Sequence, residues 1–357
     1  MDPDRGLWQN GAMVGFSIGP VRVAMPAAQA ALSGYSDLPM RRVARAHGAE
    51  YALNEVVVDE LVLIKGRAQR RLLAVPDDDH PVGGQLMGSE PEKFAAAAAA
   101  MVEAGYDVVD INFGCPVSKA LGRCRGGYLL QDPATALDIV ARVLDAVEGR
   151  VPVTVKMRRG FDDGPDSERA FFEILDGAFA RGIAAVTVHG RTVRQKYVGP
   201  SRWEFVGRVV RHVAPHPVLG SGDLFSAEAA VRMMRETGVA GVSIARGCIG
   251  NPFVFRQIRE LLAGGRPTAP TLGELGDALR LHARHALDHY GEARAGRKIR
   301  LHAIKYAQYH PEPIAARDAM VAIRTLDDVA PAIDAWFDPS RFEHRPAAMV
   351  AAGAPAG

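Results

Sequence analysis

The chain alternates short apolar runs with longer stretches in which apolar residues recur at helical spacing. The short runs are rich in Val, Ile or Ala and are broken by Gly or Pro, a pattern typical of buried strands. They predict strands at residues 28–33, 52–57, 82–87, 107–112, 152–157, 184–189, 217–221 and 241–245. The clearest helix between them is "EPEKFAAAAAAMVEAG", residues 90–105, with acidic residues at its start and a glycine after its end.

Eight strand-then-helix units match a (β/α)8 TIM barrel, and a doubly wound sheet is the alternative. No GxGxxG motif follows the first strand, which favours the barrel. Strand-like runs stop near residue 255, where the connector "LLAGGRPTAPTLGEL" leads into purely helical periodicity. The sequence therefore predicts a barrel domain at 1–260, a helical domain at 261–345 and a flexible tail at 346–357.

Composition narrows the class of protein. The chain is 48% hydrophobic and 24% charged, as in ordinary globular proteins. A net charge of +2 is too mild to indicate a nucleic-acid binder by itself, so any basic surface must be local. No apolar run approaches the roughly 18 residues of a membrane span, no CxxC pair occurs, and the acidic start does not resemble a secretory signal. We expect a reduced, cytoplasmic protein.

Candidate chemistry gathers after the predicted strands, where TIM barrels place their active sites. Each residue alone has an ordinary structural explanation, but their joint placement at one end of the barrel indicates a site. They are Gln85, Asn112, Cys115, Lys156, His189, Arg191, Ser221-Gly222-Asp223 and Ala245-Arg246-Gly247.

The last two of these loops contain glycine and are where barrels often bind phosphate through backbone N–H groups, with Arg246 as a countercharge. Lys156 would place a positive charge in the barrel mouth, suited to an anionic ring, and His189 and Gln85 would add hydrogen bonds. Flavin mononucleotide (FMN) meets both demands. Cys115 precedes a turn-fixing proline, and its thiol, protonated near neutral pH, is a candidate general acid.

Three long motifs carry a resemblance to a known family: "DINFGCPVSKALGRCRGGYLLQDP", "VTVHGRTVRQKYVGPSRW" and "VSIARGCIGNPFVF". With "AALSGYSDLPMRR", "GGQLMG" and "VTVKMRRG", they make the chain resemble the FMN-dependent tRNA-dihydrouridine synthases over roughly residues 20–260. The stretch "HYGEARAGRKIRLHAIKYAQYH" resembles the helical domain of that family more weakly.

The resemblance implies that NADPH reduces FMN, that hydride passes to C6 of a flipped-out uracil in tRNA, and that Cys115 protonates C5. It also implies a monomer without a metal. The implied flavin contacts are Ala30, Ala31, Leu32, Gln85, Lys156, His189, Ser221, Gly222, Asp223, Ala245 and Arg246. The implied substrate contacts are Asn112, Lys119, Arg191, Arg297, Lys298 and Arg300.

The chain departs from the family pattern at several positions. The family usually has Ala-Pro-Met at residues 30–32, Asn at Ser221 and Gly at Ala245, although main-chain contacts to FMN tolerate such changes. In the loop after Cys115, Cys124 and Arg125 replace the usual Gly and Ala. We expect Cys124 to be a bystander, with a thiol close to Cys115 as the alternative, and the loop leaves substrate choice open.

The predicted helical domain carries a basic stretch. Between residues 280 and 305 it contains only two acids, and its cations include Arg284, Arg294, Arg297, Lys298 and Arg300. Such a surface would bind RNA phosphates without reading sequence, and a solvated helix face is the alternative. An FMN barrel that reduces a small-molecule C=C bond is the competing function. A noncatalytic RNA-binding relative is disfavoured because Cys115, Lys156 and His189 are all present.

Overall fold

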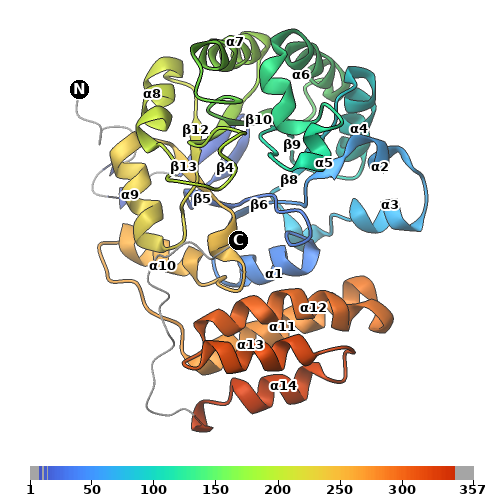
Figure 1. The fold of residues 1–357 in the computed structure, drawn as a ribbon, viewed down its shortest axis with the longest axis vertical. Helices are drawn as coiled ribbons and strands as arrows, with labels where there is room; N and C mark the ends of the chain where they lie inside the picture. The colour runs from blue at the N-terminus through green and yellow to red at the C-terminus, as the bar shows by residue number, and fades with distance from the viewer. Residues whose placement is uncertain (1–7, 10–11, 14, 342–357) are drawn as a thin grey trace.

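The computed structural model describes residues 8–9, 12–13 and 15–341, and its centre is a closed parallel barrel (Figure 1). The ring order is β6-β5-β13-β12-β11-β10-β9-β8, and pairing of β6 with β8 closes it. The short strand β7 (Val57–Val58) extends the sheet on the edge of β8. The barrel strands are β5 (Ala27–Gln29), β6 (Tyr51–Leu53), β8 (Val82–Met87), β9 (Val108–Phe113), β10 (Val153–Arg158), β11 (Ala185–His189), β12 (Val218–Ser221) and β13 (Gly241–Ile244).

The barrel confirms the predicted TIM fold, and each predicted strand overlaps an observed one. The first strand is shorter than predicted, because the chain turns at Leu32, whose carbonyl accepts hydrogen bonds from the N–H groups of Tyr35 and Ser36. Strands such as β9 and β10 are buried along their length, since one face packs inside the barrel and the other under helices. Polar residues in these strands, such as Asp110 and Thr154, are buried as well.

Helices surround the ring (Figure 1). The helix predicted at 90–105 is confirmed as α4, which begins with a proline at its first turn and ends before Gly105, a residue with φ of 93°. The helices around the barrel are α1 (Leu38–Ala46), α4 (Pro91–Glu103), α6 (Pro133–Val147), α7 (Pro165–Arg181), α8 (Trp203–Val213), α9 (Ala227–Thr237) and α10 (Val254–Leu262). Three shorter helices lie in loops: α2 (Asp59–Leu63), α3 (Arg67–Leu72) and α5 (Ser118–Leu121).

A hairpin that the sequence analysis missed closes the amino-terminal end of the barrel. Strands β3 (Phe16–Ile18) and β4 (Val21–Val23) pair antiparallel, and their apolar side chains pack against the starts of the barrel strands. A second short hairpin joins β1 (Trp8–Gln9) to β2 (Ala12–Met13). Only the carboxyl ends of the strands are therefore left to form a mouth.

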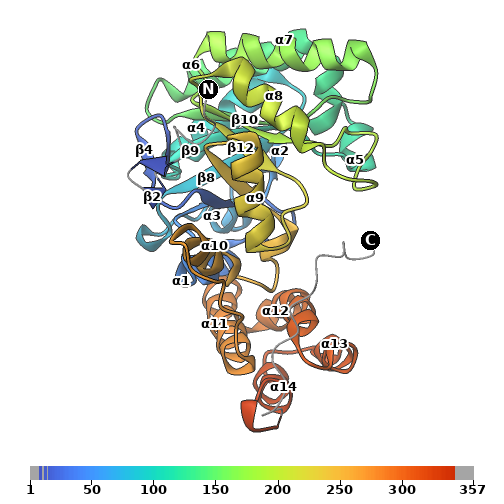
Figure 2. The ribbon, with the colours of Figure 1, turned by 90° about the vertical axis from the view of Figure 1, so that its left-hand side faces the viewer.

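A bundle of four helices follows the barrel and has its own apolar core, which includes Leu279, Ile299, Met320, Ile333 and Phe337. Its helices are α11 (Leu272–Tyr290), α12 (Glu292–Tyr306), α13 (Pro313–Ala322) and α14 (Val329–Trp336). A capping box of Thr271 and Glu274 starts α11. Figures 1 and 2 show the bundle beside α1.

The exact domain limits stay a prediction, and residues 342–345 and the predicted tail 346–357 lie outside the described residues. Within the described part, α10 still packs on the barrel core through Leu261 and Leu262, and the connector to α11 follows it. None of the described helices is both long enough and apolar enough to cross a membrane.

Candidate active site

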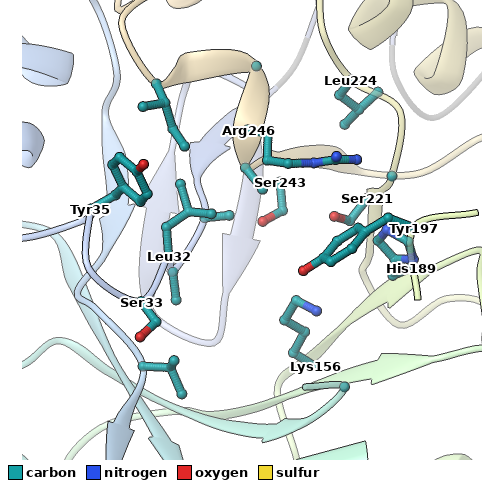
Figure 3. A pocket seen from close by; sticks show the side chains of 18 of the residues that line it. Leu32, Ser33, Tyr35, Lys156, His189, Tyr197, Ser221, Leu224, Ser243 and Arg246 are labelled. Carbon is teal, nitrogen blue, oxygen red and sulfur yellow. The ribbon is translucent and has the colours of Figure 1, made fainter. Parts of the chain in front are cut away.

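A cavity of about 450 Å³ opens at the carboxyl ends of the barrel strands (Figure 3). Its size falls within the range of small-molecule sites, about 300–1,000 Å³. The structure brings together thirteen of the residues that the sequence analysis singled out. They are Ala30, Ala31, Leu32, Asn112, Cys115, Lys156, His189, Ser221, Gly222, Asp223, Ala245, Arg246 and Gly247.

Other predicted site residues lie outside this cavity. Gln85 is buried beneath it, and Arg191 is buried behind its wall, where it forms an ion pair of 2.7 Å with Asp223. Lys119 is exposed on α5. The three predicted RNA contacts Arg297, Lys298 and Arg300 are on α12 in the helical bundle.

Gln85 belongs to a chain of hydrogen bonds that runs across the barrel interior to the cysteine loop. Its amide Nε2 donates to Asp110 Oδ2 at 2.6 Å, and its Oε1 accepts from Asn112 Nδ2 at 2.6 Å. Asn112 Oδ1 in turn accepts from the backbone N–H of Gly114 at 2.8 Å, and Thr154 Oγ1 donates to Asp110 Oδ1 at 2.6 Å. Burial raises the pKa of Asp110, against the effect of these two donors. The network therefore fixes the backbone just before Cys115.

Lys156 presents an unpaired charge to the cavity. Its ammonium points into the open space (Figure 3), and it has no hydrogen-bond or ion-pair partner among the described residues. Burial and then the charge of Arg158 lower its pKa to about 8. A positive charge held in this way is poised for an anionic group that the protein itself does not supply.

Arg158 ties two loops together and lies two residues after Lys156, the position that the sequence analysis emphasised. Its Nε donates to the carbonyl of Gly114 at 2.9 Å, and its Nη1 donates to the carbonyls of Thr192 and Lys196 at 2.9 and 2.7 Å. Burial lowers its pKa to about 10, and it stays charged near neutral pH. The double arginine in "VTVKMRRG" was the sequence signal that could have identified it.

His189 is neutral in the site. Burial lowers its pKa well below the ordinary value, and the charges of Arg158 and Lys156 act in the same direction. The backbone N–H of Arg191 donates to its Nδ1 at 3.2 Å. Its Nε2 therefore carries the proton and is a hydrogen-bond donor.

The loop after β12 lets a ligand in the cavity approach its backbone closely. Gly222 has φ of 109°, and a Cβ there would lie 2.4 Å from Ser201 Oγ and 3.0 Å from His189 Nε2. Asp223 is also left-handed, with φ of 61°, and accepts a hydrogen bond from the backbone N–H of Ser201 at 2.8 Å. Glycine is thus required, because any side chain would collide with the wall of the cavity.

Arg246 follows β13 and stacks between two aromatic rings, 4.7 Å from the centroid of Tyr197 and 4.9 Å from that of Phe225. Burial lowers its pKa. Tyr197 points toward the same space as Lys156 (Figure 3) and also lies 5.5 Å beneath the Arg158 guanidinium. The sequence analysis missed this tyrosine, although it lies within the second quoted motif.

The cysteine loop is held from several sides. Cys115 is half-buried at the cavity, and its carbonyl accepts from the N–H of Gly127 at 3.1 Å. Cys124 is exposed and does not line the cavity. Its side chain is hydrogen-bonded to Tyr128, which raises the pKa of that tyrosine. Arg125 forms an ion pair of 2.7 Å with Glu60 of α2. The two departures in this loop thus point away from the mouth.

The helical bundle also reaches the cavity, which sequence reasoning did not anticipate. Lys305, in the last turn of α12, and Gln308, in the 3-10 turn that follows, line it together with barrel residues. One face of α12 continues from Lys305 through Lys298 to Arg294, and the latter two line a second cavity of about 480 Å³ beside α3. Arg297 is exposed, whereas Arg300 donates to the carbonyl of Ile323 and so turns toward α13.

The arrangement joins an apolar wall to a cationic one. Ala30, Ala31, Leu32 and Val56 supply the apolar wall, and Lys156 and Arg246 lie in the polar part. This suits a flat aromatic ring with an anionic tail, and a thiol at the rim is placed to exchange a proton with a second molecule beside the ring. The donor set and the glycine cradle therefore fit FMN.

Comparisons with known proteins give a consistent result. The family model described as dihydrouridine synthase matches residues 28–338. The protein named "Probable tRNA-dihydrouridine synthase" in Mycobacterium tuberculosis is 35% identical over 322 residues, 87% of this chain and 82% of that protein. A counterpart in Rhodobacter capsulatus is 34% identical over 306 residues, 84% of this chain and 91% of its own length.

Solved structures share the fold at low identity. A histamine dehydrogenase from a Rhizobium species has a TM-score of 0.54 and 16% identity, covering 74% of this chain and 50% of that one. An amine oxidase from Pseudomonas geniculata has a TM-score of 0.56 and 14% identity, covering 78% of this chain and 53% of that one. The chain thus spans about half the length of each, and the likeness concerns the barrel fold alone.

Proposed function

Because the chain belongs to the dihydrouridine synthase family, we propose that it reduces uridine to 5,6-dihydrouridine in tRNA, with FMN as cofactor and NADPH as reductant. The observation that carries the proposal is the meeting of Cys115 and the unpaired Lys156 ammonium at one cavity in the barrel mouth. When bound, FMN supplies a hydride that it has received from NADPH. The three free cysteines suit a reduced cytoplasm as the place of action.

Lys156, His189 and the loops after β12 and β13 would hold the cofactor. The Lys156 ammonium stabilises negative charge on a ring, and His189 Nε2–H donates a hydrogen bond. Backbone groups at Gly222 and the Arg246 guanidinium face the same space and suit a phosphate. Ser221 and Ala245 stand where the family usually has Asn and Gly. These departures alter the side chains but leave the backbone groups available to the cofactor.

Cys115 would hold the proton that the product needs at C5 of the base. Asn112 accepts a hydrogen bond from the N–H of Gly114, just before this residue, and Arg158 donates to the carbonyl of the same glycine. The thiol is therefore delivered to a fixed position at the rim, as general acid catalysis requires. A uracil reaches such a cavity only when it is extruded from the RNA stack.

Lys305 and Gln308 are the structural reason to favour an RNA substrate over a small molecule. They extend the active-site cavity onto the helical bundle, and Arg294 and Lys298 continue the same helix face outward. A small substrate has no use for cations so far from the reacting ring. A polyanionic strand whose base enters the barrel would lie along this face.

The proposal is tested with purified protein, FMN and NADPH, given either an unmodified tRNA transcript or small enoates and free pyrimidines. The expected result is dihydrouridine in the digested tRNA and little NADPH consumption with the small molecules. Rapid reduction of a small C=C bond with no dihydrouridine in tRNA would instead support the small-molecule alternative.

A further inference from the structure

A buried cluster of three metal-ligating side chains lies where the helical bundle meets the barrel. Asp37 caps α1 of the barrel, His282 is on α11 and His302 is on α12. One ligand atom from each lies within 4.8 Å of the others. Their exposed fractions are only 7%, 2% and 2%.

The two imidazoles are short of hydrogen-bond partners. Nδ1 of His282 and Nδ1 of His302 are both buried without a partner in the described residues. Their rings are close, with centroids 4.0 Å apart at 48°. A buried polar atom left unpaired destabilises a fold, so a structure rarely keeps two side by side without use.

Asp37 is already oriented by neighbours. Its Oδ1 accepts from the N–H of Met40 at 3.1 Å, and its Oδ2 accepts from the hydroxyl of Tyr290 at 2.7 Å. Each carboxylate oxygen keeps a further lone pair. Such hydrogen bonds to a liganding carboxylate are how metal sites fix the direction of their ligands.

We propose that Asp37, His282 and His302 bind a divalent transition metal, with Zn²⁺ as the best match. Two imidazole nitrogens and one carboxylate oxygen are a ligand set that Zn²⁺ accepts in tetrahedral sites, and three protein ligands leave one position for water. The sequence analysis expected no metal; Asp37 lies far from the two histidines along the chain, and the three residues form no ligand motif.

The ion would join the two parts of the molecule. Its ligands come from a barrel helix and from two bundle helices, so binding favours the docked arrangement of α1 against α11 and α12. Tyr35, whose ring packs edge-on against His302 at 5.4 Å, also lines the active-site cavity. Metal binding would therefore stiffen the wall of the mouth without taking part in the chemistry there.

The test uses full-length protein without a histidine tag, stripped with a chelator and then titrated with Zn²⁺ or Co²⁺ alone. We expect uptake of one equivalent, a higher melting temperature with Zn²⁺, and a visible Co²⁺ absorption band of the intensity typical of four-coordinate sites. His282→Ala and His302→Ala should lose the uptake. The matched control is His285→Ala, since His285 is on α11 and also has an unpaired Nδ1 but is outside the cluster.

None of these measurements depends on flavin or RNA, so the metal proposal and the proposed function can fail separately. Failure of the parent protein to take up Zn²⁺, or equal uptake by the parent and His302→Ala, would overturn the site. Should the histidine variants not fold, the Zn²⁺ uptake and Co²⁺ spectrum of the parent decide alone, with a spectrum of six-coordinate Co²⁺ counting against the site.

Discussion

The barrel mouth and the outward face of α12 are both cationic, but they hold their charges in opposite ways. Arg158 and Arg191 are 3% and 4% exposed, and each is fixed by several hydrogen bonds to backbone carbonyls or to Asp223. Arg294 and Arg297 are exposed and have no ion-pair partner in the described part of the chain. Fixed, desolvated charges suit one small anionic group, and free, hydrated charges suit a mobile polyanion.

This difference predicts that changes in the mouth abolish chemistry, whereas changes on α12 only weaken RNA binding. The largest expected effect is that of Cys115→Ala. It should lower the rate of dihydrouridine formation by about 100- to 10,000-fold, as loss of a general acid does. Flavin content and flavin reduction by NADPH should stay near those of the parent, as measured by absorption under anaerobic conditions.

Cys124→Ala is the matched control, because that thiol is exposed on the same loop and does not line the cavity. It should form dihydrouridine at nearly the parental rate. If both variants were equally slow, the loop would matter as a structure and the assignment of the proton to Cys115 would fail.

Lys156→Met removes the unpaired ammonium at nearly constant size. By analogy with the loss of one preorganised donor to a developing charge, flavin reduction should slow by about 100-fold. Stopped-flow absorption with NADPH measures this step without RNA. Reduction at the parental rate would show that the Lys156 charge does not act on the ring.

The lowered pKa of Lys156 also predicts a pH dependence. Its pKa is about 8 in the flavin-free protein, so the cation is lost as pH rises through that value. If the cation binds the flavin, FMN affinity should fall between pH 7 and 9, by at most tenfold per unit above the pKa. The dissociation constant of FMN, measured by fluorescence at several pH values, should show this in the parent and not in Lys156→Met.

The smallest expected effect concerns α12. Replacing Arg294, Arg297 and Lys298 with Gln should weaken tRNA binding and lower the salt slope by roughly 0.7–0.9 per lost phosphate contact. Arg300→Gln is the internal control, since its guanidinium contacts the carbonyl of Ile323. If the triple variant kept the parental affinity and salt slope, this face would be a solvated helix face that does not bind RNA.

The sequence predicted the barrel well because strands such as β9 and β10 contain several Val, Ile, Met or Phe residues and alternate with helices. It also located most of the cavity, since TIM barrels gather the residues that follow their strands. It could not show that Gln85 lies below the cavity and does not line it. There the Gln85 amide is hydrogen-bonded to Asp110 and Asn112. Strand position gives the end of the barrel but not the depth of a side chain.

Contacts between distant segments were the other limit. Lys305 reaches the cavity, and Asp37 meets His282 and His302, only because the bundle docks beside α1. Helical periodicity predicts which residues of α12 share a face, but it says nothing about what that face meets. The hairpin β3–β4, whose strands have three residues each, was also missed.

The most direct test of the proposed function is the dihydrouridine content of tRNA, mapped by position, from cells with and without this gene. We expect dihydrouridine to disappear from one or more tRNA positions in the deletion, to return with the parental gene and not to return with Cys115→Ala. An unchanged dihydrouridine content at every position after deletion would contradict it.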